Sequence, residues 1–224
     1  MNDEHLHPHD HGIDPSDLAA MRALAEVDLD AEGAGPIDVA EGVLDRFGFV
    51  RQLDETLDGG FDVLRGNKVA DRVFYGITEL GDFGLIWGLL GGVRAFRSDD
   101  DLADFVRLMA CLGIESVVVN GAVKSLFKRE RPVVQVARPH RLRVPLTTSF
   151  PSGHASSAML AATLLSDGRR TGGAYYVLGL WVASSRVYVK IHHASDVAGG
   201  LVVGLALGQV AKRVWPSARH RRMR

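Results

Sequence analysis

The sequence predicts an all-α protein, a membrane-embedded helical bundle of about five apolar helices preceded by N-terminal amphipathic helices. Before Asp82, apolar residues recur at helical spacing with charged residues on the opposite face. After Asp82 the chain becomes apolar and rich in Gly and Ala. The charge changes at the same point, because residues 1–82 carry 19 acidic and 6 basic residues whereas residues 83–224 carry 8 and 20. The two parts therefore meet different surroundings.

Residues 1–36 are expected to form a solvated, disordered acidic tail. Gly33, Gly35 and Pro36 close this segment. Near its start, histidines alternate with polar residues and one proline, at His5, His7, His9 and His11. Such a run can also bind a transition metal, and this remains the alternative interpretation.

Residues 37–82 form the predicted amphipathic helical region. Its first part has apolar residues at helical spacing and charges on the other face; the apolar positions are Val39, Val43, Phe47, Val50, Leu53 and Leu57. A helix of this kind lies on a protein core or on a bilayer surface, and we expect no membrane span here.

The predicted core, residues 83–214, contains five apolar segments: 83–96, 105–123, 155–166, 172–189 and 197–211. Their uncharged runs are shorter than the roughly 20 residues that a span needs, so a soluble all-helical bundle is the alternative. Gly200, Gly204 and Gly208 place small residues on one helix face, which favours close helix contact in a membrane. Residues 215–224 form a basic C-terminal tail.

Composition excludes several classes of protein. Cys111 is the only cysteine, so the chain forms no intramolecular disulfide. The first 30 residues are acidic and lack the apolar core of a secretory signal. The acidic part would repel nucleic acid, so we expect no nucleic-acid partner.

Three short blocks carry the functional information. They follow the patterns K-x6-RP, PSGH and SR-x5-H-x3-D, and their residues are Lys124, Arg131 and Pro132, then Pro151 to His154, then Ser185, Arg186, His192 and Asp196. The blocks supply three cations, a Gly-containing turn, two histidines and a carboxylate, which suit metal-free cleavage of a P–O bond. The set resembles the type 2 phosphatidic acid phosphatase family, whose relatives include class A acid phosphatases and vanadium haloperoxidases, over roughly residues 70–214.

Lys124, Arg131 and Arg186 are the candidate phosphate-binding cations. Because Lys124 and Arg131 are two helical turns apart, a helix would place both on one face, and Pro132 would end it. The alternative for this basic stretch is a juxtamembrane cluster that binds lipid headgroups. We prefer that alternative for Lys128 and Arg129.

The PSGH block precedes an apolar segment and is expected to open a helix. Backbone N–H groups at a helix start bind anions, and Gly153 lets the backbone approach a phosphate closely. Ser152 is expected to cap this helix. The resemblance implies that Ser152 and Gly153 bind phosphate and that His154 is the general acid.

His192 and Asp196 are four residues apart, so on a helix they would share a face. The carboxylate can accept the imidazole N–H and make the other nitrogen a better nucleophile. We expect His192 to attack phosphorus and form a phosphohistidine, with Asp196 as its orienting partner. A polar helix start capped by Asp196 is the alternative, and His193 should point about 100° away.

Other polar residues receive weaker assignments. Ser185 is expected to hydrogen-bond locally rather than react. The stretch from Thr78 to Asp82 also resembles bacterial membrane members, but it is assigned no chemistry. Glu115 and Asn120 lie in an apolar segment and are expected to face the bundle interior. We expect no metal and no cofactor.

The charges of the loops predict an orientation. If the three blocks share one side, the basic C-terminal tail lies on the other, which the positive-inside rule makes cytoplasmic. The expected location is therefore an integral membrane protein, in the plasma membrane, with the active site at the outer face. The resemblance implies six spanning helices, as membrane members of the family usually have, and the counterpart of their first helix is here either missing or replaced by the acidic amphipathic region.

The leading hypothesis is a membrane phosphatase that acts on a lipid phosphate or diphosphate. A phosphotransferase that passes the phosphoryl group to an acceptor other than water, a vanadate-dependent haloperoxidase and a non-catalytic membrane scaffold are the alternatives. The blocks recognise phosphate and encode nothing about the lipid tail. The oligomeric state and the role of residues 1–82 stay open.

Overall fold

The computed structural model describes residues 48–134, 139–140, 142–145, 147–169 and 172–218. Over these residues the protein is all-α, and none of them lies in a strand. The prediction of an all-α fold is therefore confirmed for this part of the chain. The predicted tail 1–36, the start of the amphipathic region and residues 219–224 lie outside the described residues.

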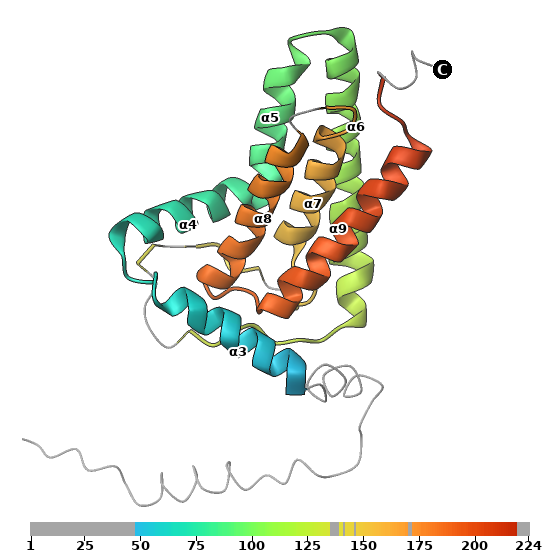
Figure 1. Cartoon of the computed structure of the whole chain (residues 1–224). Helices are drawn as coiled ribbons and strands as arrows, with labels where there is room; N and C mark the ends of the chain where they lie inside the picture. The colour runs from blue at the N-terminus through green and yellow to red at the C-terminus, as the bar shows by residue number, and fades with distance from the viewer. Residues whose placement is uncertain (1–47, 135–138, 141, 146, 170–171, 219–224) are drawn as a thin grey trace, which may run out of the picture. The chain divides into compact units, whose positions relative to one another are not determined.

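The bundle consists of helices that lie side by side (Figure 1). They are α5 (Leu85–Ala95), α6 (Asp99–Val117), α7 (Gly153–Leu165), α8 (Gly172–Tyr188) and α9 (Ala194–Val214). Each coincides with one of the apolar segments expected from the sequence. The chain alternates in direction through this bundle, so α6 ends, α7 begins, α8 ends and α9 begins at the same end (Figure 1). This topology brings the three sequence blocks to one end of the bundle.

Helix α7 is central, and α9 lies very close to it. A Cβ atom added at Gly204 would lie 2.1 Å from the carbonyl oxygen of Ser156, and one at Gly200 would lie 2.4 Å from the carbonyl oxygen of Ser152. At Gly208 the added atom would lie 2.8 Å from the Cβ of Thr163. The predicted stripe of glycines therefore faces α7, and only residues without a side chain allow this approach.

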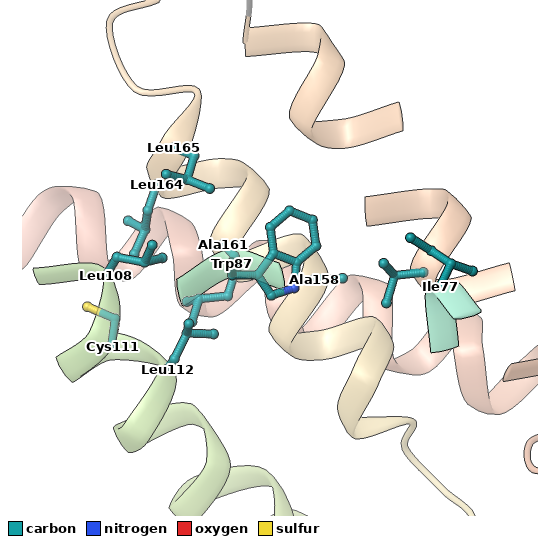
Figure 2. Close-up of a cluster of buried hydrophobic side chains, with 11 residues drawn as sticks. Ile77, Trp87, Leu108, Cys111, Leu112, Ala158, Ala161, Leu164 and Leu165 are labelled. Carbon is teal, nitrogen blue, oxygen red and sulfur yellow. The ribbon is translucent and has the colours of Figure 1, made fainter. Parts of the chain in front are cut away.

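The largest hydrophobic cluster joins α5, α6, α7 and α8 around Trp87, which is fully buried. Figure 2 shows the Trp87 ring in the middle of this cluster, with small Ala side chains of α7 beside it. A large ring against small residues fills the space between closely packed helices. This packing fixes the helix ends from which the site residues project.

The chain turns sharply between α4 (Lys68–Gly81) and α5. The link is the short 3₁₀ turn η1 (Asp82–Gly84), in which Phe83 has a φ of 54° and Gly84 a φ of 71°. Two stretches are long and apolar enough to cross a membrane by length and composition, Lys68–Ala95 and Ala194–Val214. The first of them contains this turn and is not one straight helix.

Helices α3 (Gly48–Asp62) and α4 lie at the end of the bundle where the three blocks meet (Figure 1). An aromatic cluster attaches them to the end of α8, where the Tyr188 ring stacks on Phe74 at 4.1 Å between centroids and meets Phe61 edge-on. The Tyr188 hydroxyl donates to Asp71 Oδ1 at 2.6 Å. The predicted amphipathic helices therefore pack on the bundle.

The opposite end of the bundle holds a network of buried ion pairs. Asp101 of α6 pairs with Arg94 at 3.5 Å and with Arg169 at 2.5 Å. Asp167 pairs with Arg107 at 3.5 Å and with Lys212 of α9 at 3.2 Å. Each carboxylate thus connects segments distant in sequence, at the end of the bundle away from the three blocks.

Candidate active site

Helix α6 is followed by a π-helical turn, η2 (Val118–Val123), and then by a 3₁₀ turn, η3 (Lys124–Leu126). Lys124 is the first residue of η3. The side chain is buried, and Nζ donates to Thr147 Oγ1 at 3.1 Å. Phe127, which follows, has an extended backbone. The helix thus ends before Arg131, and the prediction that one helical face carries both cations is wrong.

Arg131 lies in the extended segment after η3. Its guanidinium donates to the carbonyl oxygens of Ile191 at 2.9 Å and Thr147 at 3.0 Å. Nη1 also lies 3.3 Å from Nε2 of His192. Arg131 and Lys124 therefore converge through the loop around Thr147 rather than along a helix.

The PSGH block opens α7, as the sequence predicts. Ser152 is the N-cap, and its Oγ accepts from the Ala155 N–H. Its own N–H donates to the backbone carbonyl oxygen of Asp196 at 3.0 Å, which joins the start of α7 to the start of α9. Gly153 is the first helical residue.

His154 lies against the end of α4. Its Nε2 is 2.9 Å from Oδ1 of Asp82, and its ring would contact a Cβ atom added at Gly81. Asp82, for which the sequence predicted no chemical role, is the carboxylate that contacts His154. The signal that could have found it was the resemblance of the Thr78–Asp82 stretch to membrane members of the family.

Arg186 is buried near the end of α8, and its Nη1 donates to Thr78 Oγ1 at 2.5 Å. Its charge acts on both histidines, His154 and His192. Ser185 donates to the Val182 carbonyl oxygen at 2.6 Å, which is the local hydrogen bond expected for it. Arg186 is thus the cation shared by the two histidines.

His192 lies in the turn between α8 and α9, two residues before α9 begins. The prediction that His192 and Asp196 share one helix is therefore wrong, because His193 is the N-cap residue of α9. The turn nevertheless brings His192 Nδ1 to 3.6 Å from Asp196 Oδ2 and to 3.4 Å from Ser149 Oγ. Nδ1 faces acceptors, whereas Nε2 faces Arg131, which can only donate. Both contacts favour the same neutral tautomer, with the proton on Nδ1.

Asp196 is fully buried and accepts several hydrogen bonds. Its Oδ2 accepts from Ser149 Oγ at 2.5 Å and from the His193 N–H at 2.8 Å. His193 Nδ1 also lies 3.3 Å from this oxygen, so the expectation that His193 points away is wrong. Asp196 therefore both caps α9 and faces His192. The sequence left these two interpretations as alternatives, and the structure combines them.

Arg129 is a site residue that the sequence analysis assigned wrongly to a headgroup-binding cluster. Its Nη1 donates to Asp196 Oδ1 at 2.5 Å, and its Nη2 donates to Asp54 Oδ2 of α3 at 2.7 Å. Nothing in the local pattern separates Arg129 from Lys128, because both lie in one basic run. Ser149, two residues before Pro151, was missed for the same reason: its role depends on a carboxylate 47 residues away.

Burial and neighbouring cations lower the pKa values of His192 and Lys124, which lie in a turn and at the end of a helix. Burial lowers the pKa of His192 to about 3, and Arg186 and Arg131 act in the same direction while the hydrogen bond with Asp196 opposes them. Burial also lowers the pKa of Lys124 to about 8, again with Arg131 and Arg186 adding to the effect. At neutral pH His192 is therefore neutral, which is the form a nucleophile needs.

Glu115 of α6 and Asn120 of η2 differ in their exposure to solvent. Glu115 is buried, as expected, whereas Asn120 is exposed, so its predicted interior position is wrong. Asn120 Oδ1 nevertheless lies 3.6 Å from a Cβ atom built on Gly153. Among the described residues no three His, Cys, Asp or Glu side chains gather to hold a metal ion.

The ends of α4 and α8, the starts of α7 and α9 and the segments that connect them thus bring a cluster of cations together around two histidines. The family model of the PAP2 superfamily matches residues 104–219, just over half of the chain, and all three blocks lie within the match. The chain belongs to the PAP2 superfamily. Helices α3 to α5 precede the matched region.

Curated relatives within this superfamily are phosphatases of lipid-linked substrates by name. The chain is 38% identical over 98 residues to decaprenylphosphoryl-5-phosphoribose phosphatase of Mycobacterium tuberculosis, covering 41% of this chain and 51% of that protein. It is 30% identical over 97 residues to an undecaprenyl-diphosphatase of Bacillus subtilis, covering 43% and 50%. The chain thus spans about half the length of the curated relatives it matches.

Solved structures of PAP2 members share the fold. A transmembrane PAP2-type phosphatidylglycerolphosphate phosphatase of Bacillus subtilis superposes with a TM-score of 0.55 at 27% identity, covering 75% of this chain and 86% of that one. LpxE of Aquifex aeolicus superposes with a TM-score of 0.58 at 24% identity, covering 75% and 96%. The similarity to these structures extends over a larger share of the chain than the family match.

Proposed function

We propose that this protein is a membrane phosphatase that hydrolyses a lipid phosphate or diphosphate through a phosphohistidine on His192, without a metal ion. The observation that carries the proposal is the position of His192, with Nδ1 facing Asp196 and Ser149 and Nε2 facing Arg131. A neutral imidazole with its lone pair directed at a phosphate-binding cation is arranged to attack phosphorus.

In the first step, His192 Nε2 forms a bond to phosphorus while the bond from phosphorus to the leaving oxygen breaks. Lys124, Arg131 and Arg186 stabilise the charge on the equatorial oxygens, together with the backbone N–H groups and Ser152 at the start of α7. The charge that develops on the imidazole is stabilised by the carboxylate of Asp196, whose Oδ2 lies 3.6 Å from Nδ1.

His154 is the proposed proton donor to the leaving oxygen. Its contact with Asp82 supports this role, because the carboxylate favours the protonated imidazole that an acid needs, whereas burial and the charge of Arg186 favour the neutral form. In the second step His154 takes a proton from water, which attacks phosphorus as the N–P bond to His192 breaks. Inorganic phosphate leaves, and both histidines return to their starting states.

Embedding in a bilayer is supported by the outer surface of the bundle. Apolar side chains are exposed on several of its helices: Leu85, Leu89 and Val93 on α5, Val106, Ile114 and Val117 on α6, Val177, Leu180 and Trp181 on α8, and Val202, Leu205 and Val210 on α9. So extensive an apolar surface would be unfavourable in water and suits contact with lipid. We place the site at the outer face of the plasma membrane, with the basic C-terminal segment at the cytoplasmic face.

The names of the relatives support a choice among the lipid substrates. Two of them act, by their names, on a decaprenyl-linked phosphate and on undecaprenyl diphosphate. We therefore place a polyprenyl phosphate or diphosphate first among the lipid substrates, ahead of phosphatidate and phosphatidylglycerol phosphate.

Phosphate release by the full chain in detergent, without added metal, tests the proposal. The panel holds a polyprenyl diphosphate, a polyprenyl phosphate, phosphatidate, phosphatidylglycerol phosphate and an aryl phosphate. We expect release from at least one lipid, complete loss in His192→Ala and no loss in His140→Ala, which removes an exposed histidine. A phosphoryl-protein adduct that is stable in base and labile in acid should form on the wild type alone. Undiminished turnover by His192→Ala would exclude His192 as the nucleophile.

A further inference from the structure

Helix α3 contributes one buried side chain to the site, and that side chain is a carboxylate. Asp54 is 6% exposed and is the residue of α3 that is buried, although α3 is otherwise amphipathic. Its Oδ1 accepts from the Ser195 N–H at 2.7 Å, and its Oδ2 accepts from Ser195 Oγ at 2.8 Å. Asp54 therefore caps the start of α9 from another helix, 141 residues away in sequence.

Arg129 connects this carboxylate to Asp196. The Nη2 atom donates to Asp54 Oδ2 at 2.7 Å, while Nη1 donates to Asp196 Oδ1 at 2.5 Å and to Ser195 Oγ at 2.6 Å. The Arg129 side chain is only 15% exposed. A planar guanidinium between two buried carboxylates fixes the orientation of both.

Asp196 is held at both oxygens as a result. Arg129 occupies Oδ1, whereas Ser149 and the His193 N–H occupy Oδ2, the oxygen nearest His192. The plane of the carboxylate, and hence its alignment with His192 Nδ1, therefore depends on Arg129. Without the cation, one oxygen of a fully buried carboxylate would lose its charged partner.

We propose that Arg129 and Asp54 are positioning residues for the pair His192–Asp196, and that α3 is part of the active site. This inference rests on the proposed function, because it assigns the two residues to the same phosphohistidine reaction. Asp54 lies outside residues 104–219, so α3 extends the site beyond the part of the chain that matches the family model.

A purely structural role for the same contacts makes a different prediction. If the contacts only held α3 against α9, their loss would lower the fraction of folded protein. Activity would then fall by the same factor at every pH. A positioning role changes the charge that His192 experiences. The charged and titratable groups around His192 are Asp196 and His193 at the start of α9, Arg186 of α8, Arg131 and Arg129 of the loop, and, through Arg129, Asp54 of α3.

These charged groups determine in which direction the acid limb of the kcat/KM profile moves. Arg129 offsets part of the negative charge of Asp196, so its removal favours the protonated, inactive form of His192. The acid limb of the kcat/KM profile should then move to higher pH in Arg129→Gln. The neighbouring Lys128 is exposed and carries the same charge, so Lys128→Gln is the matched control and should leave the limb in place.

The test measures kcat, KM and the pH profile of phosphate release for Arg129→Gln, Arg129→Lys and Asp54→Asn, with Lys128→Gln and Glu55→Gln as controls. We expect kcat to fall by about 10-fold or more in Arg129→Gln with KM little changed, since loss of the orienting carboxylate itself is far more costly in a comparable triad. Arg129→Lys keeps the charge but bonds one carboxylate, so its activity should be intermediate. The double variant Asp54→Asn/Arg129→Gln should lose little more than Arg129→Gln, because the two residues act in series.

Three outcomes are distinguishable. A lower kcat with a displaced acid limb, confined to the Arg129 and Asp54 variants, supports the inference. Wild-type kinetics in Arg129→Gln, or a loss that is equal at every pH and tracks the thermal unfolding midpoint, overturns it. Absence of phosphate release from the wild type on every substrate would overturn the proposed function, and the inference with it.

Discussion

Nε2 of His154 lies 2.9 Å from Oδ1 of Asp82, a carboxylate delivered by the end of α4. The other histidine, His192, faces a second carboxylate, Asp196, at 3.6 Å. Each histidine of the site therefore has its own carboxylate, one from the turn η1 and one from the start of α9. Because the two carboxylates come from different segments, each proposed role can be tested by a substitution that leaves the other histidine's carboxylate in place.

Replacing Asp82 should affect proton donation. We expect Asp82→Asn to lower kcat on a lipid phosphate by about 10- to 100-fold, the lower part of the range for general acid catalysis. The loss should be much smaller on an aryl phosphate, whose leaving group needs no proton. Glu79→Gln, at an exposed position on the same helix, is the control. Equal losses on both substrates would contradict the assignment of His154 as the acid.

The alkaline side of the pH profile should report Lys124. Its pKa is lowered to about 8, so the free enzyme loses this positive charge as the pH rises through 8, and phosphate binding weakens. We expect kcat/KM to fall above about pH 8 for this reason. Lys124→Arg should move the decline to higher pH, since arginine keeps its proton. An alkaline limb that is unchanged in Lys124→Arg would assign it to another group.

The acid side should report the neutral form of His192. Because the pKa of His192 is lowered to about 3, the nucleophile stays neutral well below its usual range, and its protonation should not limit kcat/KM near pH 6. A profile of the wild type from pH 4 to 7 on an aryl phosphate checks this. An acid limb centred near 6.5, the ordinary value for histidine, would show that the turn opens in solution.

Orthovanadate should inhibit in competition with the substrate, because its five-coordinate adduct mimics phosphorus in the transition state. His192→Ala should bind it more weakly than the wild type, whereas EDTA should leave activity unchanged. Inhibition constants for the two proteins, measured at one ionic strength, test both points. Strong inhibition by EDTA that is reversed by a divalent cation would point to a metal-dependent step.

Packing of α9 on α7 should depend on Gly204. The Cβ of Gly204→Ala would lie 2.1 Å from the Ser156 carbonyl oxygen, so the helices must separate, at a cost of about 1–3 kcal/mol. Gly113→Ala in α6 is the matched control, because a Cβ atom there meets nothing within 4 Å. Thermal unfolding in detergent should show a lower midpoint for the first variant only. Equal midpoints would mean that α9 moves away from α7 without loss of stability.

The sequence predicted much of the fold because helical periodicity and apolar composition are local properties. The apolar segments coincide with helices, Ser152 caps α7 as expected, and the glycine stripe faces a neighbouring helix. The three blocks also meet at one end of the bundle. The helices, the cap and the stripe follow from spacing or a short pattern, whereas the meeting of the blocks was a premise of the predicted orientation.

The missed parts of the site depend on tertiary contacts. Arg129 and Lys128 are equivalent in the sequence, and only the approach of Asp54 and Asp196 distinguishes them. His192 keeps its spacing to Asp196, but a turn rather than a helix provides it, since α9 starts at Ala194. Arg131 likewise meets Lys124 through a loop after the helix has ended. Spacing alone does not reveal which backbone conformation delivers a side chain.

The turn at Phe83 and Gly84 determines the direction of α4. A straight helix over residues 68–95 would continue α4 along the axis of α5, and Asp82 would lie inside that helix. With the turn, α4 leaves the line of α5, and Asp82 comes within 2.9 Å of His154 Nε2. Straightening the chain at these two residues would therefore separate the proposed acid from its carboxylate without replacing either side chain.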